Sequence, residues 1–71
     1  MSFSYKEYMG AVWEMQEKYP NWRYGQVCFN TLYIMAPELA NEIRSSSRDP
    51  FYKDEEDMTE FWDWLVLRMV Q

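Results

Sequence analysis

Residues 21–36 read Asn-Trp-Arg-Tyr-Gly-Gln-Val-Cys-Phe-Asn-Thr-Leu-Tyr-Ile-Met-Ala, and this stretch decides the fold. Asn21 is a favoured helix N-cap residue, and Pro37 follows the stretch directly, so both ends carry helix-boundary signals. Helical spacing places one apolar row along the stretch, made of Trp22, Gly25, Phe29, Leu32 and Ala36. We therefore predict a central helix from Asn21 to about Met35.

A second, polar row runs beside the apolar one at the same helical spacing: Arg23, Gln26, Asn30 and Tyr33. A guanidinium binds anions, amides bind heterocycle edges and aromatic rings stack on bases. Arg44 and Arg48 could reach the same region if the following helix folds back. The alternative is structural: Arg23 pairs with a local carboxylate, and the amides bond neighbouring helix ends.

Three further helices are expected around the central one. Ser4 and Glu7 fit a capping box that starts a first helix ending at Tyr19-Pro20, and Phe3 with Tyr8 fits a hydrophobic staple. Pro37 suits the first turn of a short third helix that ends near Arg44. The sequence thus predicts a single all-α domain over residues 1–71, a bundle of about four helices without a sheet.

The last predicted helix, Met58 to Val70, is apolar on nearly every side. Such a helix is normally buried all round, and a short chain can hardly surround it. We expect part of it to contact a second copy or another partner and to form a homo-oligomer. The expected interface residues are Trp62, Trp64 and Leu67.

The charge is uneven along the chain. Of 71 residues, 12 are Asp or Glu and 7 are Lys or Arg, and the net charge of −5 lies in the second half. This argues against binding of duplex nucleic acid, whose affinity depends on neutralised phosphates. The acidic run Asp54, Glu55, Glu56 and Asp57 could contact a basic partner surface, or could simply cap the last helix, with Asp57 and Glu60 as a capping box.

Enzymatic activity is not expected. The chain has no His, the commonest general base, and its single Cys28 lies among apolar residues without a neighbouring cation. No phosphate-binding loop or metal-binding motif is found, so we predict no catalytic residue, no metal and no cofactor. A signal peptide and a membrane-spanning run are also lacking, which favours a cytoplasmic location.

Several short motifs occur in a distinctive order: Trp22-Arg23-Tyr24-Gly25-Gln26, Phe29-Asn30, Leu32, Pro37-Glu38-Leu39-Ala40, Ile43-Arg44 and Asp49-Pro50-Phe51-Tyr52. Together they resemble a group of very small, uncharacterised proteins encoded by bacteriophages and bacterial mobile elements. The similarity covers roughly Trp22 to Trp64. It implies a context in the bacterial host cytoplasm, since short phage proteins often inhibit host enzymes or host defence.

Three functions are compatible with this context. The first is a homo-oligomer that sequesters a nucleotide-type immune signal through the polar row with Arg44 or Arg48. The second is an acidic inhibitor of a host defence protein, of the anti-CRISPR or nucleic-acid-mimic type, acting through residues 54–57. The third is a structural module that only self-associates. The polar residues repeat at helical spacing along the central helix, whereas the acidic run has an ordinary capping explanation, so the first function is preferred.

Overall fold

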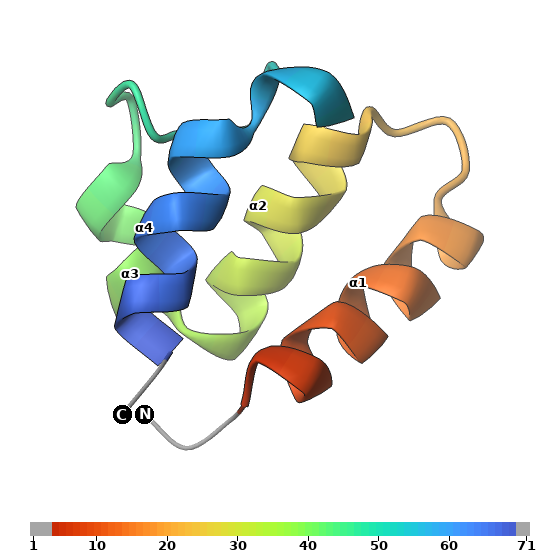
Figure 1. Cartoon of the computed structure of the whole chain (residues 1–71). Coiled ribbons are helices and arrows are strands. Elements are labelled where there is room, and N and C mark those ends of the chain that lie inside the picture. The colour runs from red at the N-terminus through yellow and green to blue at the C-terminus, as the bar shows by residue number, and fades with distance from the viewer. Residues whose placement is uncertain (1–3, 70–71) are drawn as a thin grey trace.

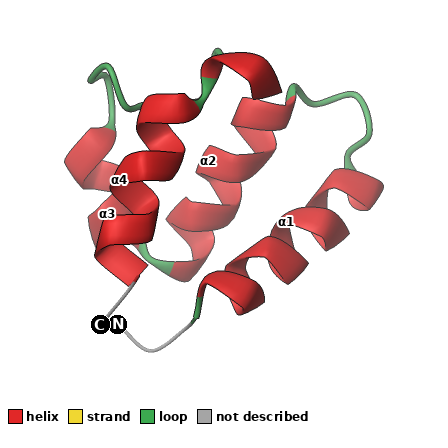
Figure 2. Cartoon of the chain, in the orientation of Figure 1, coloured by secondary structure: helices red, strands yellow, loops and turns green. Residues whose placement is uncertain are grey.

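The computed structural model describes residues 4–69 and contains four α-helices with no strand in that part of the chain, which confirms the predicted all-α fold. The helices are α1 (Tyr5–Lys18), α2 (Tyr24–Met35), α3 (Pro37–Ile43) and α4 (Thr59–Met69). Figure 1 shows α2 between α1 and α4, with α3 behind α4. The longest loop connects α3 to α4 and contains a single 3-10 turn at Glu55–Asp57 (Figure 2).

The start of α1 is as predicted. The Ser4 hydroxyl accepts a hydrogen bond from the Glu7 amide at 3.1 Å, and the Glu7 carboxylate accepts one from the Ser4 amide at 2.8 Å. Phe3, the other half of the expected staple, lies outside the described residues. On the core side, the buried Tyr8 hydroxyl donates to the Cys28 carbonyl oxygen at 2.6 Å and fixes α1 against α2.

The predicted start of the central helix is wrong by three residues. Asn21 lies in a turn rather than at the cap, and α2 begins at Tyr24 with Arg23 as its N-cap. The turn is stabilised by the stacking of the Trp22 ring on the Tyr19 ring, whose centroids are 4.1 Å apart. This aromatic stack, together with a hydrogen bond from the Trp22 amide to the Tyr19 carbonyl oxygen at 3.1 Å, holds Trp22 outside the helix.

The boundary between α2 and α3 is set at one residue. Ala36 is fully buried, its amide still bonds to the Leu32 carbonyl oxygen, and its backbone then leaves the helical region. Pro37 follows as the first residue of α3, where its missing N–H costs nothing. The predicted short third helix is therefore confirmed, and it turns sharply from α2 so that Ala40 and Ile43 reach the core.

The inner side of α4 closes the core. Met58, Phe61 and Leu65 are at most 1 % exposed, and Trp64 is 7 % exposed. Met58 directly precedes α4, so Asp57 lies in the 3-10 turn and the expected Asp57–Glu60 capping box is misplaced. Among the described residues, the apolar core consists of Tyr8, Val12, Val27, Cys28, Phe29, Leu32, Ala36, Ala40, Ile43, Met58, Phe61, Trp64 and Leu65.

A single copy of the chain buries α4 further than the sequence predicts. Trp64, expected at a partner interface, belongs to the core of the single chain, and Trp62 is half-buried against Phe61 and the Tyr24 ring. Of the three expected interface residues only Leu67 is exposed, at 77 %. The reason is that Trp64 lies on the side of α4 that faces the core, while the Trp62 ring packs against the rings of Tyr5 and Tyr24.

Candidate ligand-binding site

A pocket of about 400 Å³ lies between α2 and the segment that follows α3. One wall is the outward side of α2, and the other is formed by the end of α3 and the turn at residues 49–52. Its volume falls within the range of roughly 300–1,000 Å³ that is typical of small-molecule sites. The pocket is lined by Phe29, Asn30, Tyr33, Arg44, Ser45, Asp49, Phe51 and Tyr52.

Arg44 supplies the positive charge of the pocket. Its guanidinium carbon lies 5.4 Å from the centroid of the Tyr33 ring and 5.8 Å from that of the Phe29 ring, within cation–π range. No carboxylate among residues 4–69 forms an ion pair with Arg44. The cation is therefore held against two ring faces while its charge is left without a neutralising partner.

Aromatic surface surrounds this cation. Tyr33 is 46 % exposed and Tyr52 is 81 % exposed, so both rings are accessible to a planar ligand. Phe51 contacts both Phe29 and Tyr52 edge-to-face, at centroid distances of 5.9 Å and 4.8 Å. The half-buried Asn30 adds an amide that can both donate and accept hydrogen bonds.

The second wall is stabilised by a carboxylate that bonds the backbone. One Asp49 oxygen accepts from the Ser45 amide at 2.8 Å, and the other accepts from the Phe51 amide at 3.0 Å. Ser45 has a φ of 65°, in the left-handed region that non-glycine residues seldom adopt. The Asp49 bond to its amide compensates for this strain, so Asp49 has a structural reason to lie in the pocket.

Gly25 allows the segment at residues 50–53 to approach α2 closely. Its amide donates to the Lys53 carbonyl oxygen at 3.2 Å, across from the first turn of α2. A Cβ atom at this position would lie 1.9 Å from the Pro50 carbonyl oxygen and 2.4 Å from that of Lys53. Only glycine fits here, and its absence of a side chain determines how near the pocket wall comes to α2.

The structure brings together three of the six residues predicted to bind a ligand: Asn30, Tyr33 and Arg44. Arg23 lies instead at the start of α2, where its Nε is 3.5 Å from an Asp54 oxygen, as the structural alternative expected. Gln26 is half-buried on α2 but does not line the pocket.

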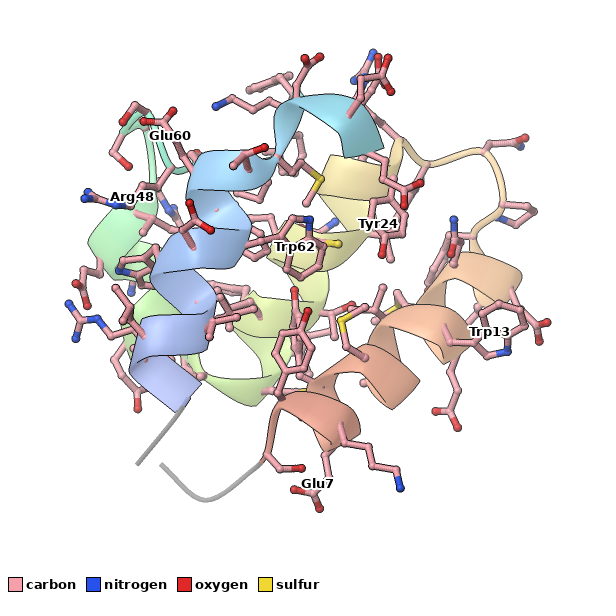
Figure 3. The ribbon with its side chains drawn as sticks, viewed as in Figure 1. Glu7, Trp13, Tyr24, Arg48, Glu60 and Trp62 are labelled. Atoms are coloured by element: carbon pink, nitrogen blue, oxygen red, sulfur yellow. The ribbon has the colours of Figure 1, made fainter. Side chains whose placement is uncertain are left out.

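Arg48, the last of the six, lines a different hollow, with Glu60 and Asp63 of α4. Figure 3 shows Arg48 beside Glu60, on the side of the loop that faces α4. The chain turns after α3 between Arg44 and Arg48, and the two residues line different hollows.

Sequence reasoning missed most of the second wall. In the sequence, Asp49, Phe51 and Tyr52 stand out only as members of the Asp49-Pro50-Phe51-Tyr52 motif, and none of them is among the predicted ligand-binding residues. Two adjacent aromatics after an Asp-Pro turn are a usable signal, because at least one of the two rings is expected to pack on a neighbouring surface. What the sequence did not reveal is that this surface includes Phe29 of α2.

The acidic run predicted to contact a partner is exposed. Asp54 pairs loosely with Arg23, and Glu55, Glu56 and Asp57 form the exposed 3-10 turn ahead of α4. These carboxylates lie at the opposite end of α2 from Tyr33, so they do not share the pocket with Arg44.

The thiol of Cys28 is shielded from solvent. Cys28 is fully buried, and burial raises the pKa of its thiol from 9.0 to about 12, although hydrogen bonds with Tyr24 and Tyr8 oppose the change. A thiol of this kind stays protonated and is a poor nucleophile at neutral pH. In residues 4–69, no three His, Cys, Asp or Glu side chains are grouped closely enough to hold a metal ion.

Comparisons with protein-family models, with curated proteins and with solved structures give no match for this chain. No helix within residues 4–69 combines the length and the apolar character needed to cross a membrane. The pocket and the residues that line it are therefore the features of this chain that bear on a ligand.

Proposed function

We propose that this chain is a non-enzymatic binding protein whose pocket takes a nucleotide-type ligand, with an anionic group next to a planar heterocycle. The observation that carries the proposal is Arg44, a cation held on two aromatic faces without an ion-pair partner among the described residues. A phosphate that binds this guanidinium completes its charge pairing.

The neighbouring groups match the rest of such a ligand. A base can stack on the exposed rings of Tyr33 or Tyr52, and such stacking contributes about 1–3 kcal/mol per base. The Asn30 amide is placed on the same lining and can bond a base edge. The Asp49 oxygens already accept two backbone hydrogen bonds, which reduces their repulsion of a bound anion.

In the biological role that we propose, the protein sequesters a nucleotide-type immune signal and thereby protects a phage or mobile element from host defence. Sequestration needs no chemistry on the ligand, in agreement with the buried, protonated Cys28. The phage context is taken from the motif resemblance, and the ligand class from the pocket.

The test is isothermal titration calorimetry of the purified protein against linear and cyclic nucleotides. Arg44→Ala should weaken binding by at least about tenfold, because it removes the charge-assisted bonds to phosphate. Arg48→Ala is the matched control, since it removes the same exposed charge outside the pocket. Equal binding by wild type and Arg44→Ala, or no binding of any nucleotide, would refute the proposal.

A second candidate function is inhibition of a host defence protein through the acidic run. The supporting observation is that Glu55, Glu56 and Asp57 are all exposed on one 3-10 turn and make no ion pair with another described residue. Affinity for a basic partner would then fall steeply with salt and with charge reversal of the run. Arg44→Ala would leave such inhibition unchanged, which separates the two candidates.

A further inference from the structure

A second hollow lies on the other flank of α2, between α2 and α1. This groove has a volume of about 190 Å³, below the range of roughly 300–1,000 Å³ usual for small-molecule sites. It is therefore better suited to protruding side chains than to an organic ligand. The groove is lined by Ala11, Glu14, Met15, Lys18, Thr31, Ile34 and Met35, none of which lines the pocket.

The same face carries both a hollow and a projection. Ile34 is 66 % exposed, one of the most exposed large apolar side chains among the described residues, and it stands at the edge of the groove. The groove beside it is walled by Met15 and Met35, which are only half-buried. A face with an apolar projection next to an apolar hollow is complementary to a second copy of itself when a twofold axis relates the two.

The charges on this face have the same self-complementary arrangement. Glu14 and Lys18 are exposed, lie one helical turn apart on α1 and line the groove. Neither forms an ion pair with another described residue. When two α1 helices cross antiparallel about a twofold axis, Glu14 of each copy faces Lys18 of the other, so the pairing is satisfied twice.

One buried polar group lies beside this groove without a partner in the described chain. The Thr31 hydroxyl has no hydrogen-bond partner, although Thr31 is 1 % exposed and lines the groove. Nearly all buried polar side-chain atoms in proteins have a partner.

We propose that the face formed by α1 and α2 is the interface of a twofold-symmetric homodimer. In this dimer Ile34 of each copy enters the groove of the other, and two Glu14–Lys18 pairs close over the contact. This interface replaces the expected one on α4, whose Trp64 is already buried within a single copy. The dimer is independent of ligand binding, because the groove and the pocket share no residue.

The test is sedimentation equilibrium of wild type and charge variants. Wild type should dimerise, and Glu14→Lys and Lys18→Glu should each raise the dimer dissociation constant by about tenfold or more, because like charges then face each other. An equimolar mixture of the two variants should dimerise again, since every facing pair is then opposite in charge. Labelling one variant with ¹⁵N lets native mass spectrometry identify the restored species as the heterodimer.

Two further variants locate the interface. Ile34→Asp should abolish the dimer, whereas Leu67→Asp on α4 should not. Because both side chains are exposed, both variants should fold, and circular dichroism checks that they do. The proposal is overturned if wild type stays monomeric at all concentrations or if the mixture fails to restore the dimer. Loss of the dimer in Leu67→Asp alone would overturn it as well and would assign the interface to α4.

Discussion

The two hollows flanking α2 differ in how they are built. The pocket has one helical wall and one wall made of a turn, whereas the groove lies between two helices. A turn can place a cation, rings and backbone groups around a small volume, and the pocket accordingly combines Arg44, Asn30 and Tyr52. Two packed helices leave only a small hollow of about 190 Å³ between their side chains, so the groove suits side chains of a matching protein surface. Adjacent positions of one helix, Asn30 and Thr31, serve these two different surfaces.

The largest expected effect comes from the glycine that holds the turn against α2. Gly25→Ala places a Cβ atom 1.9 Å from the Pro50 carbonyl oxygen, so the turn must move away and the chain should lose about 3 kcal/mol of stability. The pocket should lose its ligand affinity while the dimer through the groove persists. Urea unfolding measures the first effect, and calorimetry with sedimentation measures the others.

Gly10→Ala is the control for this prediction. A Cβ atom at Gly10 meets nothing within 4 Å, and the residue is exposed inside α1. The substitution should stabilise the chain by about 0.5–1 kcal/mol because alanine favours the helix. A Gly25→Ala protein as stable as wild type, with an intact pocket, would contradict the proposed role of the close approach.

An intermediate effect is expected at alkaline pH, where loss of the fold should disrupt the pocket and the groove together. Burial raises the pKa of Cys28 from 9.0 to about 12 and that of Tyr24 from 10.0 to about 12, and it raises the pKa of Tyr8 well above its ordinary value. The folded state therefore keeps protons that the unfolded state releases. The free energy of unfolding should keep its full value below about pH 9 and should decrease as the pH rises toward about 12.

Urea unfolding between about pH 7 and pH 11 measures this decline. In Cys28→Ala its onset should move up toward about pH 10, where only the buried tyrosines of the unfolded chain begin to lose protons. Ligand binding and dimerisation should be lost over the same pH range as the fold. Stability that stays constant up to about pH 11 would show that these groups are not shielded from solvent.

The smallest effect is expected at the floor of the groove. Thr31→Val keeps the shape of the side chain but removes the unpartnered hydroxyl, so the monomer should gain about 1 kcal/mol of stability. Thermal unfolding at low protein concentration measures the gain, and calorimetry should show unchanged ligand binding in the pocket. A loss of monomer stability would mean that the hydroxyl has a partner within the folded chain.

Local signals in the sequence predicted the fold well. Ser4 with Glu7 marks the start of α1, and Pro37 marks the start of α3, because caps and prolines act over a few residues. The start of α2 was misjudged because the stacking of Trp22 on Tyr19 outweighs the capping preference of Asn21. That stack is a side-chain contact outside the helix, which helical periodicity does not detect.

The candidate site could be predicted only in part. Asn30 and Tyr33 follow from helical spacing along α2, and Arg44 from the assumption that α3 folds back. Their neighbours in the second wall depend on the path of the loop, which is set by the contact of Gly25 with Lys53. The burial of Trp64 was missed for another reason: a helix that is apolar all round has no contrast between its sides.

The contact between Gly25 and the segment at Pro50 and Lys53 is made by main-chain atoms, so it is indifferent to the side chains carried by that segment. Tyr52, 81 % exposed on that segment, can therefore be exchanged without changing where the wall lies. Selection for a different ligand would therefore conserve Gly25 and its main-chain contact, whereas an exposed lining residue such as Tyr52 could change. The surface of the proposed ligand site can thus change while the shape of the pocket is inherited.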